Sequence, residues 1–459
     1  MSNVLEQIVD FAINLKYEDL PNEVVSHVKR FFLDSVGCAF GGCDTDDVSI
    51  YREYYQSIGG SPDASVFAME QKLPAAHAAM LNALMIRTLD YNDIYWEEDP
   101  SHPSDLIPAA LTPAELLGKN GKDVITAIAL AYEIEMRLCE IAHPGIRERK
   151  WHHATFTAFV APLVAAKVMG FEKTEIMHAV GIGGCHQATF GAVAAGQLTM
   201  MKNTVDPMAV QGGVEAAILA GRGYSGPHHV LEGKEGLSET IDSVSWDLES
   251  LVCDLGKRYR ILRGSMKAFP TEALTHSPIS AIMKIQEEQT IVPEEIEDVT
   301  IATIARAADI LADSTKYHPT ARETADHSLP YCIAAMLLDG ELTPEQFSVK
   351  RINKPDIQQF MSKINVVVDP AFETMFPEKK PASAIVRLKN GDKFSAEVDY
   401  PKGDYRNPLT DEEIWAKIRP LMEGCTTSAH AEQIVDVIQD MEQVADIHAF
   451  MNILAGRRE

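Results

Sequence analysis

A short stretch near residue 90 contains residue types that can move a proton. Asp90 and Asp93 lie three positions apart, and His102 follows them after an aromatic segment. An Ala-rich helix pattern over residues 75–89 leads into the stretch and would place both carboxylates on one face at its end. A carboxylate that orients an imidazole raises its basicity, so the three residues predict an acid/base site. The alternative interpretation is an ordinary polar connection between two helices.

Four further places carry polar residues in apolar or small-residue surroundings. They are His152 and His153, then Lys202, then Lys267 with Glu272, and finally Tyr317 with Arg322 and His327. Each has an ordinary structural explanation when taken alone, because isolated lysines are usually exposed and histidines at helix starts often act as caps. They become informative only as a set.

The elements that would position these residues are mostly helices. Apolar residues recur at helical spacing over residues 4–16, 24–36, 75–89, 106–111, 121–138, 151–169, 173–180 and 207–221. The pattern changes near residue 267. Strands are predicted at 298–304, 363–368, 384–389 and 394–398, and helices at 276–288 and 325–339. Asn390–Gly391 between the last two strands is a strong hairpin signal.

These patterns predict a mainly α fold built from two domains. A large all-helical domain is expected from residues 1–266 and 403–459, because two or three closing helices follow residue 410. An inserted α+β lid domain is expected from residues 267–402. A chain of 459 residues is too long for a single hydrophobic core, which agrees with more than one domain.

Composition and charge limit the class of partner. The chain has 67 acidic and 41 basic residues and a formal net charge of -26, which argues against nucleic acid or an anionic membrane as partner. A small anionic substrate remains compatible, because a site needs only a few local cations. The seven cysteines form no C-x-x-C pair, and the N-terminus has no basic region followed by an apolar core. We therefore expect a cytoplasmic protein without a zinc or iron–sulfur site.

Several motifs together resemble the MmgE/PrpD family, most closely its 2-methylcitrate dehydratase type. The motifs are residues 89–93 with 102–105, Phe269-Pro270-Thr271-Glu272, residues 324–331 followed by 337–340, and Pro401-Lys402-Gly403-Asp404. They occur in the family's order and cover nearly the whole chain. The resemblance implies a helical domain from both chain ends, a lid, a cleft between them, a homodimer and no cofactor.

The resemblance also implies which residues form the site. The catalytic residues it implies are Asp90, Asp93, His102, Lys202, Tyr317 and a histidine of the pair His152 and His153. The substrate-binding residues are Lys267, Glu272 and the weaker candidate Arg322. The family's decarboxylases have a histidine where this chain has Glu272, which favours dehydration.

The expected function is dehydration of a small tricarboxylate, 2-methylcitrate or citrate, to the corresponding cis-aconitate. A base must remove a proton next to a carboxylate, cations must stabilise the resulting charge, and an acid must protonate the leaving hydroxyl. His102 and a histidine of the 152/153 pair are the acid/base candidates. The alternatives are a cis-aconitate decarboxylase or a polycarboxylate epimerase on the same scaffold. A metal-dependent hydrolase and a non-catalytic relative are further alternatives.

Overall fold

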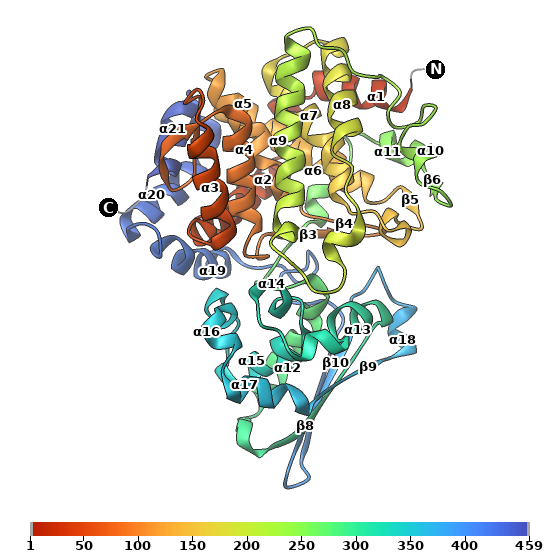
Figure 1. The fold of residues 1–459 in the computed structure, drawn as a ribbon, viewed down its shortest axis with the longest axis vertical. Helices are drawn as coiled ribbons and strands as arrows, with labels where there is room; N and C mark the ends of the chain where they lie inside the picture. Colours follow the sequence, from red (N-terminus) through yellow and green to blue (C-terminus); the bar gives the residue numbers. More distant parts are fainter. Residues whose placement is uncertain (1–2, 457–459) are drawn as a thin grey trace.

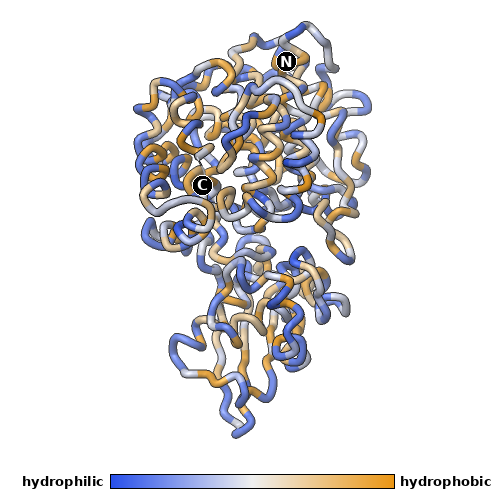
Figure 2. The backbone as a smooth tube through the Cα atoms, turned by 60° about the vertical axis from the view of Figure 1, so that its left-hand side comes forward, coloured by the Kyte–Doolittle hydropathy of each residue, from blue (hydrophilic) through white to orange (hydrophobic). Residues whose placement is uncertain are grey.

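The structure, a computed structural model, describes residues 3–456 and is mainly helical, as predicted. Figure 1 shows two lobes joined at a narrow waist. We use the name helical lobe for the part that holds α1–α11 and α19–α21, and the name sheet lobe for β8–β11 with α12–α18. Two separate hydrophobic cores correspond to the two lobes. Figure 2 shows apolar segments concentrated inside the helical lobe, whereas the far tip of the sheet lobe is hydrophilic.

The helical lobe contains fourteen of the described helices. They are α1 (Val4–Asn14), α2 (Asn22–Gly42), α3 (Asp46–Ile58), α4 (Ala75–Arg87), α5 (Ile107–Leu116), α6 (Gly121–Leu138), α7 (Ala154–Met169), α8 (Lys173–His186), α9 (Met201–Gly221), α10 (Leu237–Thr240), α11 (Leu248–Val252), α19 (Asp411–Glu423), α20 (Ser428–Gln439) and α21 (Ile447–Ala455). α9 lies at its centre and packs against both α4 and α7. Small residues allow this close approach: a Cβ added at Gly213 of α9 would lie 2.5 Å from the Cβ of Ala161 on α7.

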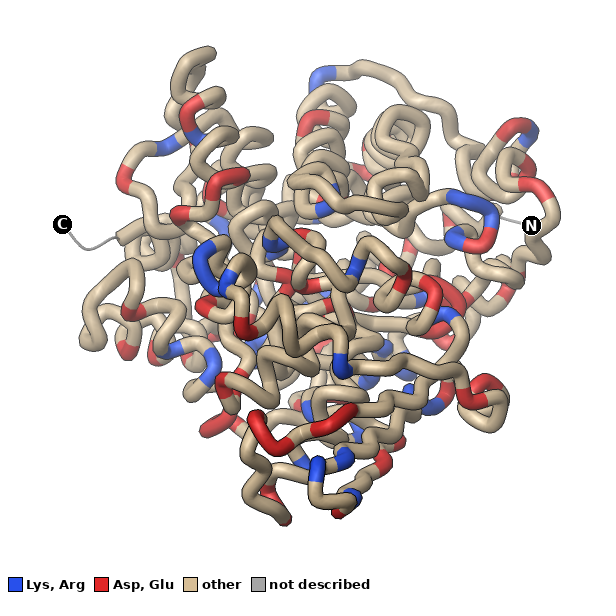
Figure 3. The backbone as a smooth tube through the Cα atoms, turned by 60° about the horizontal axis from the view of Figure 1, so that its bottom comes forward, with Lys and Arg blue, Asp and Glu red and all other residues tan. Residues whose placement is uncertain are grey.

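The sheet lobe is organised around a four-stranded sheet with the order β11–β10–β8–β9. Its elements are β8 (Ile296–Thr303), β9 (Ile364–Val368), β10 (Ala382–Leu388), β11 (Lys393–Val398), α12 (His276–Glu288), α13 (Ala305–Leu311), α14 (Arg322–Ala325), α15 (Leu329–Asp339), α16 (Val349–Ile352), α17 (Pro355–Phe360) and α18 (Pro370–Glu373). The predicted hairpin is confirmed: β10 and β11 pair antiparallel, and Gly391 in the turn has φ +94°. α12 covers β10 and β11, and Figure 3 shows charges of both signs interspersed over this lobe.

Two connections cross the waist side by side: one follows Met266 into the sheet lobe, and the other, at Gly403, returns the chain to the helical lobe. The backbone amide of Met266 donates to the carbonyl oxygen of Gly403 at 3.0 Å. Gly403 has φ +91°, and a Cβ there would lie 1.9 Å from the carbonyl oxygen of Met266, so only glycine fits this crossing. Beyond it, α19 packs on α2, where Lys417 Nζ lies 2.6 Å from Asp34 Oδ1. Both ends of the chain therefore share one core.

The structure corrects the expectation of an all-helical lobe. Short strands lie within it, namely β1 (Ala64–Val66), β2 (Met69–Leu73), β3 (Asp93–Trp96), β4 (Pro100–Ser101), β5 (Ala142–His143), β6 (Ser245–Trp246) and β7 (Ser265–Met266). Asp90 and Asp93 do not share a helix face, because α4 ends at Arg87 and Asp93 begins β3. The domain boundaries at residues 267 and 403 stay a prediction. Within residues 3–456, no helix combines the length and apolarity needed to cross a membrane.

Candidate active site

A small three-stranded sheet brings His102 and Lys267 to the same place. β3 lies between β4 and β7, and both outer strands run antiparallel to it. Strands that are antiparallel to a common neighbour end beside the first residues of that neighbour. His102 directly follows β4 and Lys267 directly follows β7. Both side chains therefore lie near the start of β3, next to Asp90 and Asp93.

Three cationic side chains lie around the carboxylate of Asp90. Its Oδ1 lies 2.6 Å from Arg87 Nη1 and 2.5 Å from Lys267 Nζ, and its Oδ2 lies 3.4 Å from Lys202 Nζ. The backbone at Asp90 has φ +50°, a left-handed conformation that aspartate tolerates better than most residues. Burial raises the pKa of Asp90, but Lys202 and Lys267 outweigh it and hold the pKa well below its usual range. We call Arg87, Asp90, Lys202 and Lys267 the lysine cluster.

Lys202 connects the lysine cluster to the sheet lobe. Its Nζ lies 3.2 Å from Asp326 Oδ2 and 3.4 Å from His327 Nδ1. His327 Nδ1 in turn lies 2.6 Å from Asp326 Oδ1. Burial and the nearby Lys202 lower the pKa of His327 to about 4, so this imidazole is neutral at neutral pH. The ammonium of Lys202 therefore lies between carboxylates of both lobes.

His102 is a neutral imidazole with one free nitrogen. Its Nδ1 lies 2.6 Å from the backbone carbonyl oxygen of Asp93, so Nδ1 carries the proton and donates it. Burial lowers its pKa well below the ordinary 6.5, and Arg87 and Lys267 lower it further. Nε2 has no hydrogen-bond partner among the described residues. His102 can therefore accept a proton at Nε2.

His152 and His153 lie just before α7 and complete what we call the histidine cluster, His102, His152 and His153. The ring centroids of His152 and His153 are 3.9 Å apart, and those of His102 and His153 are 5.6 Å apart. His152 Nδ1 accepts a hydrogen bond from the backbone amide of Ala154 at 3.2 Å. His153 Nε2 faces Asp206 Oδ2 at 3.3 Å. The two adjacent histidines thus have different partners.

Glu272 supplies a carboxyl that can hold a proton at neutral pH. One of its oxygens accepts a hydrogen bond from the backbone amide of Leu274 at 2.7 Å. Burial raises the pKa of Glu272 to about 7, although Lys267 and the amide oppose the increase. The carboxyl is therefore close to half-protonated at neutral pH and can act as an acid.

These groups face one cavity of about 520 Å³ between the lobes. It is lined by both clusters, by Arg147, Lys150 and Trp151, by the Gly- and Ala-rich segment 191–198, and by Glu272, Asp309, Asp313, Lys316 and His327 of the sheet lobe. Lys316 Nζ donates to the carbonyl oxygen of Gly196 at 3.1 Å across the opening. The cavity is large enough for a small polycarboxylate, and its cations suit that charge.

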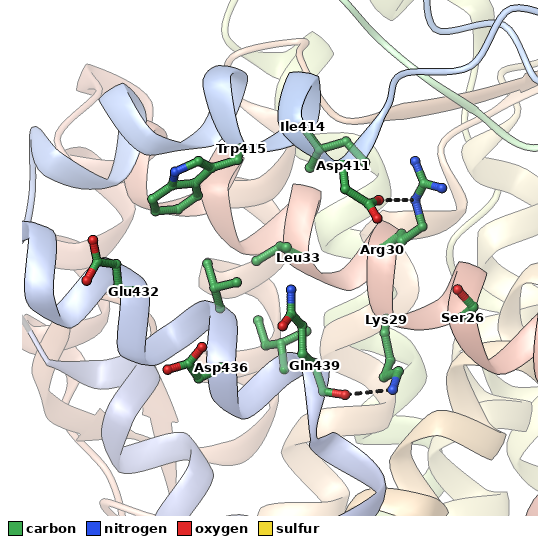
Figure 4. Close-up of a pocket in the computed structure, with 12 residues that line it drawn as sticks. Ser26, Lys29, Arg30, Leu33, Asp411, Ile414, Trp415, Glu432, Asp436 and Gln439 are labelled. Atoms are coloured by element: carbon green, nitrogen blue, oxygen red, sulfur yellow. Dashed lines mark hydrogen bonds and ion pairs between the residues drawn. The ribbon is translucent and has the colours of Figure 1, made fainter.

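A second hollow of about 500 Å³ lies between α2, α19 and α20 (Figure 4). Its two cationic side chains already have partners: Arg30 Nε lies 3.3 Å from Asp411 Oδ1, and Lys29 Nζ donates to the backbone carbonyl oxygen of Gln439 at 2.6 Å. No acid and base converge there. The cavity between the lobes is therefore the candidate active site.

The structure corrects the expected partners of His102. Asp93 accepts a hydrogen bond from the His102 ring at its backbone carbonyl oxygen, not at its carboxylate. The Asp93 carboxylate instead accepts hydrogen bonds from the backbone amide and the hydroxyl of Ser104, at 3.1 and 2.6 Å. Burial raises the pKa of Asp93 to about 6. Asp90 binds cations and does not contact His102. The two carboxylates thus lie close to the histidine in sequence but have other functions in the fold.

Two further predicted residues do not line the cavity. The hydroxyl of Tyr317 points to the carbonyl oxygen of Ile364 at 3.3 Å within the sheet lobe. Arg322 Nη2 lies 2.9 Å from Thr88 Oγ1 and 3.6 Å from Asp47 Oδ2, so it connects the two lobes. The other predicted residues, namely Asp90, His102, His152, His153, Lys202, Lys267 and Glu272, do line it.

The sequence analysis missed Arg87, Asp206, Asp326 and Lys316. Arg87 is the last residue of α4, three positions before Asp90, which is a visible i,i+3 pairing. Lys202 and Asp206 are four residues apart on α9, but the predicted helix began at residue 207 and hid this relation. Asp326 was part of a motif, next to His327. No sequence signal distinguishes Lys316.

Two groups of side chains are close enough to bind one cation together: His152, His153 and Asp206, and Asp90, Asp326 and His327. In the second group the ammonium of Lys202 already occupies the position between the acceptors. In the first group Asp206 Oδ1 accepts from Thr157 at 2.9 Å while Oδ2 faces His153. Both groups already have protein partners, and we assign a metal to neither.

The cavity between the helical lobe and the sheet lobe brings buried lysines next to neutral histidines and a protonatable carboxyl, the groups that acid/base chemistry on a small anion requires. Comparison with protein families identifies the family of the chain. The MmgE/PrpD N-terminal domain matches residues 6–247, and the MmgE/PrpD C-terminal domain matches residues 269–443. The chain belongs to the MmgE/PrpD family.

Relatives of two activities are similar over most of their length. The cis-aconitate decarboxylase of Homo sapiens is 25% identical over 99% of this chain and 95% of its own, and that of Aspergillus terreus (strain NIH 2624 / FGSC A1156) is 24% identical over 99% and 96%. The 2-methylcitrate dehydratase of Escherichia coli (strain K12) is 24% identical over 87% of this chain and 85% of its own. Family members are thus enzymes of both kinds.

Proposed function

We propose that this protein is a lyase that removes a proton from the carbon next to a carboxylate of a small polycarboxylate. We further propose that it dehydrates 2-methylcitrate or citrate to the corresponding cis-aconitate without a cofactor. One observation carries the proposal: the neutral His102, the buried Lys202 and Lys267, and the protonatable Glu272 all line one cavity. This set contains a base, charge stabilisation and an acid.

Each group has a step that it can perform. His102 Nε2 takes the proton from the carbon next to the carboxylate, and the ammonium groups of Lys202 and Lys267 stabilise the negative charge that develops. The electron pair forms a carbon–carbon double bond as the carbon–oxygen bond breaks. The hydroxyl takes the proton of Glu272 and leaves as water. His102 is then an imidazolium and Glu272 a carboxylate, and proton exchange with solvent resets both.

Decarboxylation of cis-aconitate is the second candidate. The decarboxylases named above support it, because they are similar over 99% of this chain. In that reaction a carboxylate leaves as carbon dioxide and a carbon is protonated, so the same cations stabilise the same kind of charge. Glu272 favours dehydration, because a protonated carboxyl suits a leaving hydroxyl.

A substrate panel separates the candidates. Purified protein is mixed with 2-methylcitrate, citrate, isocitrate and cis-aconitate, and ultraviolet absorbance and carbon dioxide are followed. The proposal predicts the absorbance of a new double bond from a hydroxy acid and no carbon dioxide. Carbon dioxide released from cis-aconitate would establish the decarboxylase instead. A change of configuration without either signal would establish an epimerase, and inactivity toward all four acids would overturn the proposal.

We propose that residues 267–402 form a lid domain over the cavity. Contacts across the waist support this, because Lys202 pairs with Asp326 and Lys316 donates to Gly196. A lid that closes on the substrate would exclude water from the reaction. Small-angle scattering with and without the acid found in the panel tests it, and an unchanged profile would contradict closure.

We also propose a cytoplasmic homodimer. Exposed apolar side chains on two neighbouring helices support self-association: Ile50, Tyr54 and Ile58 on α3, and Met201 and Leu219 on α9. The helices are adjacent, since Tyr55 Oη donates to Gln211 Oε1 at 2.8 Å. Sedimentation equilibrium at micromolar concentration tests this, and a monomer would contradict it.

A further inference from the structure

Asp206 does not line the cavity, but its buried contact with His153 indicates a function for it. We propose that Asp206 is a positioning residue that fixes the ring of His153, so that its other nitrogen faces the substrate. His153 rather than His152 is then the histidine whose free Nδ1 accepts a hydrogen bond from the bound acid beside the base His102. This inference rests on the proposed function for its kinetic part, but its structural part is testable without any substrate.

The pair is exclusive. His153 Nε2 lies 3.3 Å from Asp206 Oδ2, and among the described residues neither atom makes a hydrogen bond to any other group. Both side chains are buried. Leaving either polar atom unpaired there would be costly, so each atom depends on the other. Burial raises the pKa of Asp206, but the contact with His153 and the nearby Arg87 outweigh burial and hold the pKa below its usual range.

The orientation leaves the opposite side of the ring free. His153 lines the cavity, and its Nδ1 makes no hydrogen bond within residues 3–456. If the Nε2 that faces the carboxylate of Asp206 carries the proton, the lone pair of Nδ1 faces the cavity. The neighbour His152 has the reverse arrangement, because its Nδ1 is already occupied by the amide of Ala154. The two adjacent histidines are therefore not equivalent.

The other carboxylate oxygen of Asp206, Oδ1, is hydrogen-bonded to a chain of buried hydroxyl and carboxyl groups. Thr157 Oγ1 lies 2.9 Å from Asp206 Oδ1 and 3.0 Å from Glu135 Oε1. A hydroxyl has one proton, so it can donate to only one of these oxygens. Burial raises the pKa of Glu135 to about 8, so Glu135 is protonated at neutral pH and can donate to Thr157. Thr157 then donates to the ionised Asp206, so each of these two hydrogen bonds has one donor and one acceptor.

The other titratable groups around His153 are few. His152 and His102 lie beside its ring, Asp99 acts on it from the connection before β4, and Arg87 approaches the same carboxylate of Asp206. Burial lowers the pKa of both His102 and His152, so both are neutral. Asp206 is therefore the ionised carboxylate in contact with His153.

The kinetic test compares Asp206→Asn with a control that removes a buried carboxylate elsewhere. Glu115→Gln is that control, because Glu115 is buried, pairs with Lys72 at 2.7 Å and lies outside the cavity. We expect Asp206→Asn to lower kcat by about 10–100-fold, the range for residues that orient a functional group, with little change in KM. We expect the pH profile of kcat to shift as well. The control should keep the wild-type kcat and pH profile.

Thr157→Val and Thr157→Ser give a second pair of variants if Asp206→Asn does not fold. The valine variant removes the hydroxyl that donates to Asp206, whereas the serine variant keeps it. We expect a lower kcat for valine and near wild-type kcat for serine. Equal activity of the two variants would contradict the chain from Glu135 to His153.

The structural test uses protein labelled with ¹⁵N histidine, without substrate. We expect the His153 signal, identified by its loss in His153→Gln, to show the proton on Nε2 in the wild type and a changed tautomer balance in Asp206→Asn. A wild-type proton on Nδ1, or Asp206→Asn with wild-type kcat and pH profile, would overturn the inference. If the wild type converts no acid of the panel, the proposed function fails, and this spectrum still decides the inference.

Discussion

The lysine cluster and the histidine cluster line the same cavity but differ in the partners of their buried groups. Burial lowers the pKa of Lys267 as it lowers those of His102 and His152, but the carboxylate of Asp90 contacts Lys267 and opposes the decrease. Around Asp90 three cations share a carboxylate, so charge persists although every side chain is nearly inaccessible. In the histidine cluster burial lowers the pKa of His102 and His152, which remain neutral. Burial disfavours the charged form of each of these groups, and an ionised carboxylate in contact with a lysine opposes that effect.

This difference gives the two clusters different chemical functions. The lysine cluster presents fixed positive charge, which can bind carboxylates and stabilise an anion. The histidine cluster presents free ring nitrogens, which can accept a proton. Variants in one cluster should therefore change different kinetic parameters from variants in the other.

Removing the base should give the largest effect. We expect His102→Ala to lower kcat by about 10²–10⁴-fold, the usual contribution of a general acid or base, with little change in KM. Steady-state kinetics on the acid found in the panel measures this, with circular dichroism as the folding control. A folded variant with near wild-type kcat would remove His102 from the mechanism.

Removing a cation from the lysine cluster should instead weaken binding. We expect Lys202→Ala to raise KM by about 10–100-fold, because a hydrogen bond to a charged group is lost. kcat should fall as well, because Lys202 also stabilises the negative charge that develops in the transition state. Lys202→Arg should rescue poorly, because a planar guanidinium does not replace a compact ammonium. Unchanged KM and kcat in Lys202→Ala would contradict the proposal that the lysine cluster binds the substrate and stabilises its charge.

The pH profile should report the carboxyl that faces both clusters. Glu272 acts when protonated and its pKa is raised to about 7, so kcat should fall as pH rises through this value. The neutral base His102 has a lowered pKa, so the acidic limb should lie well below pH 6.5. Glu272→Gln should lower kcat and abolish the alkaline limb. A limb that persists in Glu272→Gln would assign it to another group.

The smallest effect should come from Tyr317→Phe. The hydroxyl of Tyr317 points to the carbonyl oxygen of Ile364 and not into the cavity. We expect kcat and KM to change by less than about twofold, because no contact with substrate is removed. A large fall in kcat would show that the sheet lobe rearranges around bound substrate and restores the role predicted from the sequence.

Long periodic segments were predictable from the sequence, and short ones were not. The helix at residues 276–288 and the hairpin at Asn390–Gly391 have strong periodic or turn signals, and both are confirmed. The strands β4 and β7 contain two residues each and have no detectable period, so the small sheet that joins His102 to Lys267 was missed. Side-chain direction was missed as well, because tertiary packing alone turns Tyr317 and Arg322 away from the cavity.

The central claim is that His102 accepts a proton from the carbon next to a substrate carboxylate. The most direct test is incorporation of solvent deuterium at that carbon when the protein adds water back to the unsaturated acid in heavy water, followed by nuclear magnetic resonance with wild-type protein and folded His102→Ala. The account predicts incorporation by the wild type with the acid found in the panel, and a rate lower by about 10²–10⁴-fold in the variant. Incorporation at the wild-type rate by His102→Ala would contradict it.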